Sequence, residues 1–166
     1  MAADGDRDSF IVGTVNRRHR KKLQQHLTEA AGWPGVERVV GLLRDGADPN
    51  TPGPGRTTPL YRASVQNRVD NVRALLAAGA DSNTESGTGE EGLPLCGAAC
   101  WGHVESVRQL LAAGADPNLR EDNGSGRTAA EWAETGGHQH ALELLTANHP
   151  ATPRPTRPAA ESERGP

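Results

Sequence analysis

Apolar residues recur along this chain at helical spacing, in short segments that follow one another in pairs. Residues 93–118 show the pattern most clearly, because two apolar stripes flank Gly102-His103 and Gly114-Ala115-Asp116 follows the second stripe. Residues three and four apart share one face of a helix, so each stripe predicts an amphipathic helix. The same order returns at residues 58–83 and in part at 36–50. The chain is therefore predicted to repeat one two-helix unit.

The Leu-Leu pairs in the second helix of each unit define the period. Their second members are 33, 35 and 34 residues apart, at Leu43, Leu76, Leu111 and Leu145. The Gly-Ala-Asp turns give steps of 33 and 35, since they start at Gly46, Gly79 and Gly114. A fixed period of this length indicates a solenoid of stacked units. We expect Leu76 and Leu111 to face the adjacent unit, so that replacing either by Ala costs about 2–5 kcal/mol.

Several polar and small residues occupy positions that suit the ends and contacts of these helices. Thr58 can cap a helix that begins at Pro59, and Thr128 with Glu131 forms a capping-box sequence. The glycines of the Gly-Ala-Asp turns accept the left-handed backbone that ends a helix. Small residues in the first helices allow neighbouring units to approach closely, and they are Ala63, Ala98, Ala99 and Ala133.

These motifs resemble the ankyrin repeat. The resemblance rests on the Thr-Pro-Leu-x-x-Ala opening at 58–63, the Gly-His pair at 102–103, the Leu-Leu pairs and the Gly-Ala-Asp-x-Asn close. It implies an all-α ankyrin-repeat solenoid of about four helix-turn-helix units with hairpin-like loops, whose terminal units depart from the motif because they cap the stack. Two full repeats are expected near 55–83 and 90–118, between capping repeats near 24–50 and 124–148.

The same reading divides the chain into three parts. The repeat domain is expected to span 14–149 and to begin with a basic helix, which carries the cluster Arg17-Arg18-His19-Arg20-Lys21-Lys22 at its N-terminal end. Positive charge there opposes the helix dipole, so the cluster does not serve helix stability. Residues 1–13 and the Pro-rich residues 150–166 are predicted to be disordered tails.

Composition and charge narrow the function further. The chain of 166 residues is 34% hydrophobic and 3% aromatic, which suits a core of small repeated contacts. Its net charge of -3 provides no overall attraction to nucleic acid. The acidic start lacks an apolar signal segment, no apolar run could span a membrane, and two cysteines do not make a disulfide scaffold. We expect a soluble, cytoplasmic monomer without membrane contact.

No motif in the sequence indicates catalysis or a bound metal. Cys96, Cys100 and His103 form a candidate soft-metal group, but no fourth ligand stands at a metal-like spacing. The alternative is that His103 bonds to the backbone of a neighbouring unit. The Gly-rich residues 87–92 are not followed by the Lys-Ser/Thr of a phosphate-binding loop. We predict a protein that is not an enzyme, with no catalytic residue, cofactor or metal.

The resemblance to ankyrin repeats implies a concave surface that binds a protein partner. Trp33 and Trp101 occupy equivalent positions at the ends of first helices, whereas Trp132 is offset and is expected in the core. Exposed aromatic residues often anchor interfaces, although each Trp could instead pack on the adjoining loop. The predicted contact residues are Arg56, Tyr61, Gln66, Glu90, Glu91, Cys100, Trp101 and Arg127.

Two other functions stay open. The basic segment 17–22 could bind nucleic acid, although the concave surface has no matching basic stripe. The repeats could also act only as a stabilising domain for partner-binding tails.

Overall fold

The computed structural model describes residues 7–87, 89 and 91–147, and all regular structure within them is helical. The prediction of an all-α fold is confirmed. Two single-turn 3-10 helices, η1 (Pro54–Arg56) and η2 (Asp122–Gly124), lie in loops. The α-helices are α1 (Arg7–Ala31), α2 (Val36–Arg44), α3 (Pro59–Val65), α4 (Val69–Ala77), α5 (Pro94–Cys100), α6 (Val104–Ala112), α7 (Ala129–Thr135) and α8 (Gln139–Ala147).

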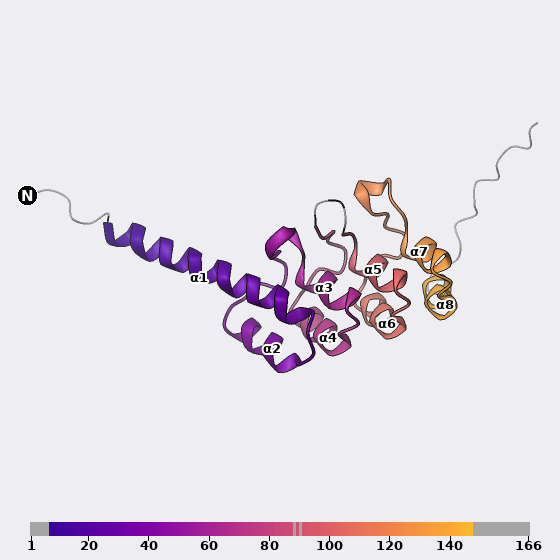
Figure 1. Ribbon diagram of the computed structural model, residues 1–166, viewed down its shortest axis with the longest axis horizontal. Helices are drawn as coiled ribbons and strands as arrows, with labels where there is room; N and C mark the ends of the chain where they lie inside the picture. The colour runs from indigo at the N-terminus through magenta and orange to yellow at the C-terminus, as the bar shows by residue number, and fades with distance from the viewer. Residues whose placement is uncertain (1–6, 88, 90, 148–166) are drawn as a thin grey trace, which may run out of the picture.

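The helices form successive antiparallel pairs, which stack side by side (Figure 1). The first helices of the pairs, α1, α3, α5 and α7, contact one another in order and form one layer. The second helices, α2, α4, α6 and α8, form the other layer in the same order. Three loops project from the same side of the stack, above the layer of first helices (Figure 1).

Local contacts at the helix ends agree with the sequence. The hydroxyl of Thr58 accepts a hydrogen bond from the Tyr61 N–H at the start of α3 (3.3 Å). Thr128 and Glu131 form the predicted capping box at the start of α7. Helices α2, α4 and α6 are each followed by a glycine with a positive φ, as predicted, with values of 94°, 89° and 88° at Gly46, Gly79 and Gly114.

The core consists of small and branched apolar side chains at the contacts between units. Ala63, Ala98, Ala99 and Ala133 are fully buried, which confirms that small residues let the first helices approach closely. The fully buried leucines are Leu27, Leu60, Leu75 and Leu110.

The Leu-Leu pairs contribute to this core differently from the prediction. Leu75 and Leu110 are fully buried, whereas Leu76 and Leu111 are only partly buried against the core. Helices α4, α6 and α8 begin at residues 69, 104 and 139, so Leu145 corresponds to Leu110 and the last step is 35 residues. The larger stacking role therefore belongs to Leu75 and Leu110, the first members of their pairs. One residue further along a helix is a rotation of about 100°, which turns the second leucine toward the edge.

Polar side chains connect each unit to the next at two recurring positions. Asn50 clamps the following turn, since its Nδ2 donates to the Gly79 carbonyl (2.8 Å) and its Oδ1 accepts from the Asp81 N–H (2.7 Å). Asn83 makes the same two bonds one unit later. Nε2 of His103 donates to the Val65 carbonyl (3.2 Å), which confirms the predicted bond between units. His138 and Arg68 bond in the same way to the carbonyls of Cys100 and Gly32.

The loops and the first helix define the boundaries of the repeat domain. Each loop is closed by a backbone hydrogen bond, as expected for hairpin-like loops: Gly53 to Thr57, Ser86 to Gly92 and Glu121 to Arg127. Helix α1 begins at Arg7, so the predicted tail over 1–13 is wrong for residues 7–13. Adding a residue to an existing helix costs far less than nucleating one, and no proline stops this helix. Residues 1–6 and the predicted tail over 150–166 lie outside the described residues.

Candidate functional site

A hollow lies on the stack where the C-terminal ends of α3 and α5 meet. It encloses about 530 Å³, and it is lined by Tyr61, Val65, Gln66, Trp101 and His103. The first two belong to α3 and the others to the turns that end α3 and α5. Three of the predicted contact residues, Tyr61, Gln66 and Trp101, therefore lie in one place. We call this hollow the α3–α5 groove.

The exposed tryptophans belong to a row of equivalent positions along the stack. The carbonyls of Gly32, Val65 and Cys100 are bonded in the same way by the next unit, so the residues that follow them correspond. These residues are Trp33, Gln66 and Trp101. Trp33 is 67% exposed and Trp101 is 65% exposed, so neither is packed under its adjoining loop.

The floor of the groove depends on a glycine in the middle of α5. A Cβ atom at Gly97 would lie 2.6 Å from Cγ1 of Val65 and 3.0 Å from the ring of Tyr61. The side chains of α3 therefore rest directly on the α5 backbone. Sequence reasoning missed Gly97, although a glycine inside a helical pattern is a signal of close packing.

Carboxylates above the groove impose a negative potential on it. Burial raises the pKa of Tyr61 to about 12, and the nearby charges of Glu91 and Glu121 add to the increase. Burial and the charge of Glu121 also raise the pKa of the Cys100 thiol, while Arg127 acts in the opposite direction. Tyr61 and Cys100 are therefore neutral near pH 7, and the charge at this end of the groove comes from the glutamates.

Sequence reasoning missed Glu121, a half-buried carboxylate that joins α5 to α7. One carboxylate oxygen accepts the Trp132 Nε1–H (2.6 Å) and the other accepts the Leu93 N–H at the start of α5 (3.2 Å). Burial raises the pKa of Glu121, and the bond from Trp132 works against that increase. Trp132, expected in the core, packs against it but is only half-buried. No sequence motif marks this arrangement, since α5, α7 and the third loop meet only in the folded chain.

The predicted loop residues are not part of the groove lining, and most of them bond within the chain. Glu91 accepts hydrogen bonds from the hydroxyls of Thr57 and Ser86, both at 2.7 Å. The exposed Arg127 places its guanidinium 4.7 Å from the centre of the Trp132 ring. The Arg56 side chain is exposed, and its carbonyl accepts the Gly87 N–H. Glu90 lies outside the described residues, and Cys100 is half-buried with its carbonyl bonded to His138.

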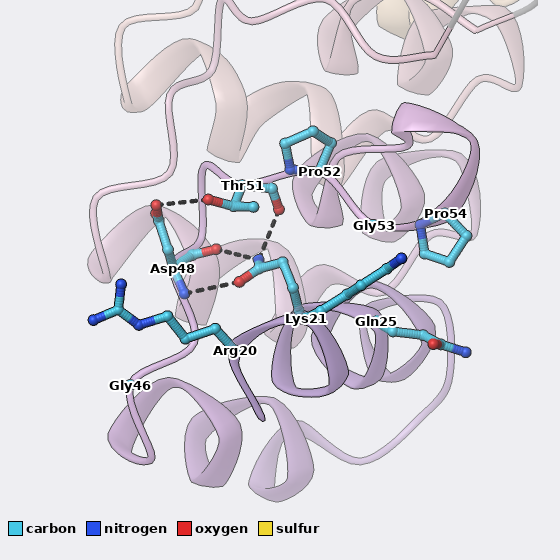
Figure 2. Close-up of a pocket in the computed structure, with 10 residues that line it drawn as sticks. Arg20, Lys21, Gln25, Gly46, Asp48, Thr51, Pro52, Gly53 and Pro54 are labelled. Carbon is cyan, nitrogen blue, oxygen red and sulfur yellow. Dashed lines mark hydrogen bonds between the residues drawn. The ribbon is translucent and has the colours of Figure 1, made fainter. Parts of the chain in front are cut away.

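A second hollow lies between α1 and the first loop. It encloses about 750 Å³, and Figure 2 shows the residues that surround it. Gln24 holds the loop against the helix, because its Nε2 donates to the carbonyls of Asp48 and Thr51 and its Oε1 accepts the Asp48 N–H. Arg20 and Lys21 of the basic segment line this hollow, and their side chains extend in opposite directions (Figure 2). We call it the α1–loop cavity.

The described part of the chain also contains histidine, cysteine and acidic side chains outside the two hollows. No group of three or more His, Cys, Asp or Glu side chains is arranged there to hold a metal ion. Cys96 and Cys100 are free thiols, and Cys96 is buried with its Sγ 3.8 Å from the Arg127 carbonyl. None of the helices described has the length and apolar character required to cross a membrane.

Comparison with known proteins identifies the repeat. The family model of the ankyrin repeat matches residues 93–122, which contain α5, α6 and the start of the third loop. No curated protein matches the chain. Helices α2 and α4 are followed by the same glycine turn as α6, and the bonds between units recur along the stack. Ankyrin repeats are general protein–protein interaction modules and are typically non-catalytic. The chain therefore contains an ankyrin repeat, at residues 93–122.

Proposed function

We propose that the protein is a non-catalytic binding module that holds a protein partner in the α3–α5 groove. The observation that carries this proposal is the exposed Trp101, which stands at the rim of a preformed hollow with Tyr61 and Gln66. Large aromatic side chains at the centre of a surface are the residues that most often supply binding energy in protein interfaces. The outer layer, α2, α4, α6 and α8, offers no comparable exposed aromatic side chain among the described residues.

The row of equivalent positions supports a contact that extends beyond one unit. Trp33 and Trp101 are two units apart, with Gln66 between them. Packed helices are about 8–10 Å apart, so the two indoles are separated by roughly 20 Å. A partner segment that follows the layer of first helices would therefore reach both tryptophans. The amide of Gln66 is exposed between them and can bond to partner backbone.

The electrostatics of the groove favour a partner with a basic side chain. Glu91 and Glu121 raise the pKa of Tyr61 through their negative charge, after the larger effect of burial. A Lys or Arg that entered between Tyr61 and Trp101 would meet this potential and the faces of two aromatic rings. Cations over aromatic rings gain about 0.5–2 kcal/mol, more when water is excluded.

A rigid scaffold lowers the conformational entropy that is lost when the partner binds. Tyr61 and Val65 of the groove sit on α3, and the end of α3 is bonded to the next unit through His103. Less side-chain and backbone freedom is then lost on association than with a flexible site.

The test is affinity capture from cells that express the protein, followed by identification and purification of the partner. The wild type is compared by calorimetry with Trp101→Ala combined with Gln66→Ala. We expect the double variant to weaken binding by about 2 kcal/mol or more, since aromatic anchors carry effects of that size. Arg108→Ala is the matched control, because Arg108 is exposed on α6 in the outer layer.

The melting temperature distinguishes a loss of binding from a loss of folding. The double variant is expected to melt at the temperature of the wild type, because Trp101 and Gln66 are both exposed. Binding that is unchanged in the double variant, or reduced equally by Arg108→Ala, would contradict the groove as the binding site.

A further inference from the structure

The basic segment of α1 is not used for ion pairs within the part of the chain that the structure describes. The ion pairs found there involve Arg73, Arg108 and Arg120, and none involves a residue of α1. Residues 17–22 are all exposed. Their charges therefore have no acidic partner among the described side chains.

These charges are not spread evenly around the helix. Arg17, Arg20, Lys21 and Gln24 follow the spacing i, i+3, i+4 and i+7, which places them on one face. Gln24 fixes the orientation of that face, because its side chain is bonded to the first loop. Of the cations on this face, Arg20 and Lys21 line the α1–loop cavity, whereas Lys22 is not part of its lining.

The cavity offers both charge and apolar surface. Arg20 and Lys21 of α1 line it together with Pro52, Gly53 and Pro54 of the loop. The Arg20 side chain lies on the side of Gly46 and Asp48, and the Lys21 side chain extends toward Gly53 and Pro54 (Figure 2). Its volume of about 750 Å³ lies within the range of about 300–1,000 Å³ that is typical of ligand pockets. The one carboxylate on the lining, that of Asp48, already accepts the Asn50 N–H and the Thr51 hydroxyl. Arg20 and Lys21 can therefore pair with an anion from outside the chain.

We propose that the α1–loop cavity is a second binding site, which takes an acidic peptide segment of a protein partner. Carboxylate side chains of the segment pair with Arg20 and Lys21, while its aliphatic portions pack on Pro52 and Pro54. The inference does not depend on the α3–α5 groove, because no residue is shared between the two hollows.

A protein segment fits this site better than a nucleic acid. Single-stranded nucleic acids are held by aromatic side chains on which bases stack, and none of the residues lining the cavity is aromatic. Duplex DNA is held by a broad basic surface that follows the phosphates. Here two cations, Arg20 and Lys21, line the cavity, and the rest of the lining is made of glutamine, proline, glycine, threonine and Asp48.

The experiment uses the full chain and a capped hexaglutamate peptide labelled with fluorescein, followed by fluorescence anisotropy at low salt. We expect saturable binding that weakens roughly tenfold in the double variant Arg20→Gln, Lys21→Gln, since loss of about 1.4 kcal/mol is a factor of ten. The double variant Arg18→Gln, Lys22→Gln removes the same charge from the same helix outside the cavity lining. It should change the affinity by about twofold or less, through long-range attraction alone.

A third variant tests the cavity independently of charge. Gln25 is exposed and lines the cavity, and its side chain bonds only to Glu29 of its own helix. Gln25→Trp fills part of the space without changing the charge, so we expect it to weaken hexaglutamate binding by roughly as much as the charge variant. Circular dichroism and a thermal melt check that each variant keeps the fold.

Four outcomes overturn the proposal. The wild type could fail to bind hexaglutamate, or the two charge variants could weaken binding equally, which would indicate undirected attraction. Binding unaffected by Gln25→Trp would place the peptide outside the cavity. A thymidine hexanucleotide could bind more tightly than hexaglutamate at the same salt concentration. If its affinity also fell in the Arg20→Gln, Lys21→Gln variant, the site would be assigned to nucleic acid instead.

Discussion

The α3–α5 groove and the α1–loop cavity are hollows on one scaffold with opposite chemical character. The groove carries exposed aromatic surface beneath the carboxylates of Glu91 and Glu121. The cavity is lined by Arg20 and Lys21 and by prolines, without an aromatic side chain. A net charge of -3 conceals this separation, because acidic and basic residues largely cancel over the whole chain. Local placement therefore says more about partners than total charge does.

The two hollows are also built in different ways. The groove lies between two complete units, and repeated bonds such as His103 to Val65 hold its walls. The cavity lies at the first described unit, where α1 extends beyond the stack (Figure 1). There the single side chain of Gln24 holds the loop. The groove should therefore depend on the stability of the whole stack, and the cavity on one residue.

The largest effect is expected from Leu110→Ala, behind the groove. Leu110 is fully buried between α6 and its neighbours, so its loss leaves a cavity that should cost about 2–5 kcal/mol. Leu111→Ala is the matched control, because Leu111 is only partly buried. Urea unfolding of both variants measures the difference. A larger loss in Leu111→Ala would contradict the assignment of the buried position.

Gln24→Ala should have the next largest effect, confined to the cavity. It removes three hydrogen bonds to the backbone of Asp48 and Thr51 and should cost about 1–3 kcal/mol. We expect weaker hexaglutamate binding, with the affinity of the groove for its partner unchanged. Gln25→Ala, which removes only a bond to Glu29 on the helix surface, serves as the stability control. An equal loss of stability in both variants would contradict the role of Gln24 in holding the loop.

Trp132→Phe tests the acidic edge of the groove. Phe keeps an aromatic ring under Arg127 but loses the N–H that donates to Glu121, so we expect a loss of about 1–2 kcal/mol. The pKa of Glu121 should rise further, since the bond from Trp132 lowers it. A double-mutant cycle with Glu121→Gln gives the coupling, measured by thermal melts near neutral pH. Additive effects of the two substitutions would show that the bond contributes nothing.

The smallest effect is expected in the pH dependence of stability. Burial lowers the pKa of His103 below 6.5, so the unfolded chain binds this proton more readily than the folded protein. The contribution of the neutral imidazole is present above pH 6.5 and is lost as the pH falls through that value toward the lower folded pKa. In His103→Gln, the decrease in Tm between about pH 7.5 and about pH 5.5 should be smaller. The exposed His140→Gln is the control and should retain the full decrease.

Most of the scaffold could be predicted from local patterns, and the departures have physical causes. Caps such as Thr58 and glycine turns such as Gly79 depend on neighbours close in sequence, so their spacing was sufficient. The choice between Leu110 and Leu111 was not predictable from spacing, because adjacent residues differ only in their rotation about the helix. The sequence prediction places the start of α1 too late, because no sequence motif marks the extension of the helix into residues 7–13.

The sequence by itself determined the repeat, its period to within a residue, the helical class and the positions of Trp33 and Trp101 at the ends of first helices. Only the tertiary structure decided that Tyr61 and Val65 rest on Gly97, that Glu121 joins α5 to α7 through Leu93 and Trp132, and that Arg20 and Lys21 line a cavity closed by Gln24. The physical reason is distance along the chain. Caps and turns are made by residues a few positions apart, whereas each surface hollow forms between segments that stacking brings together.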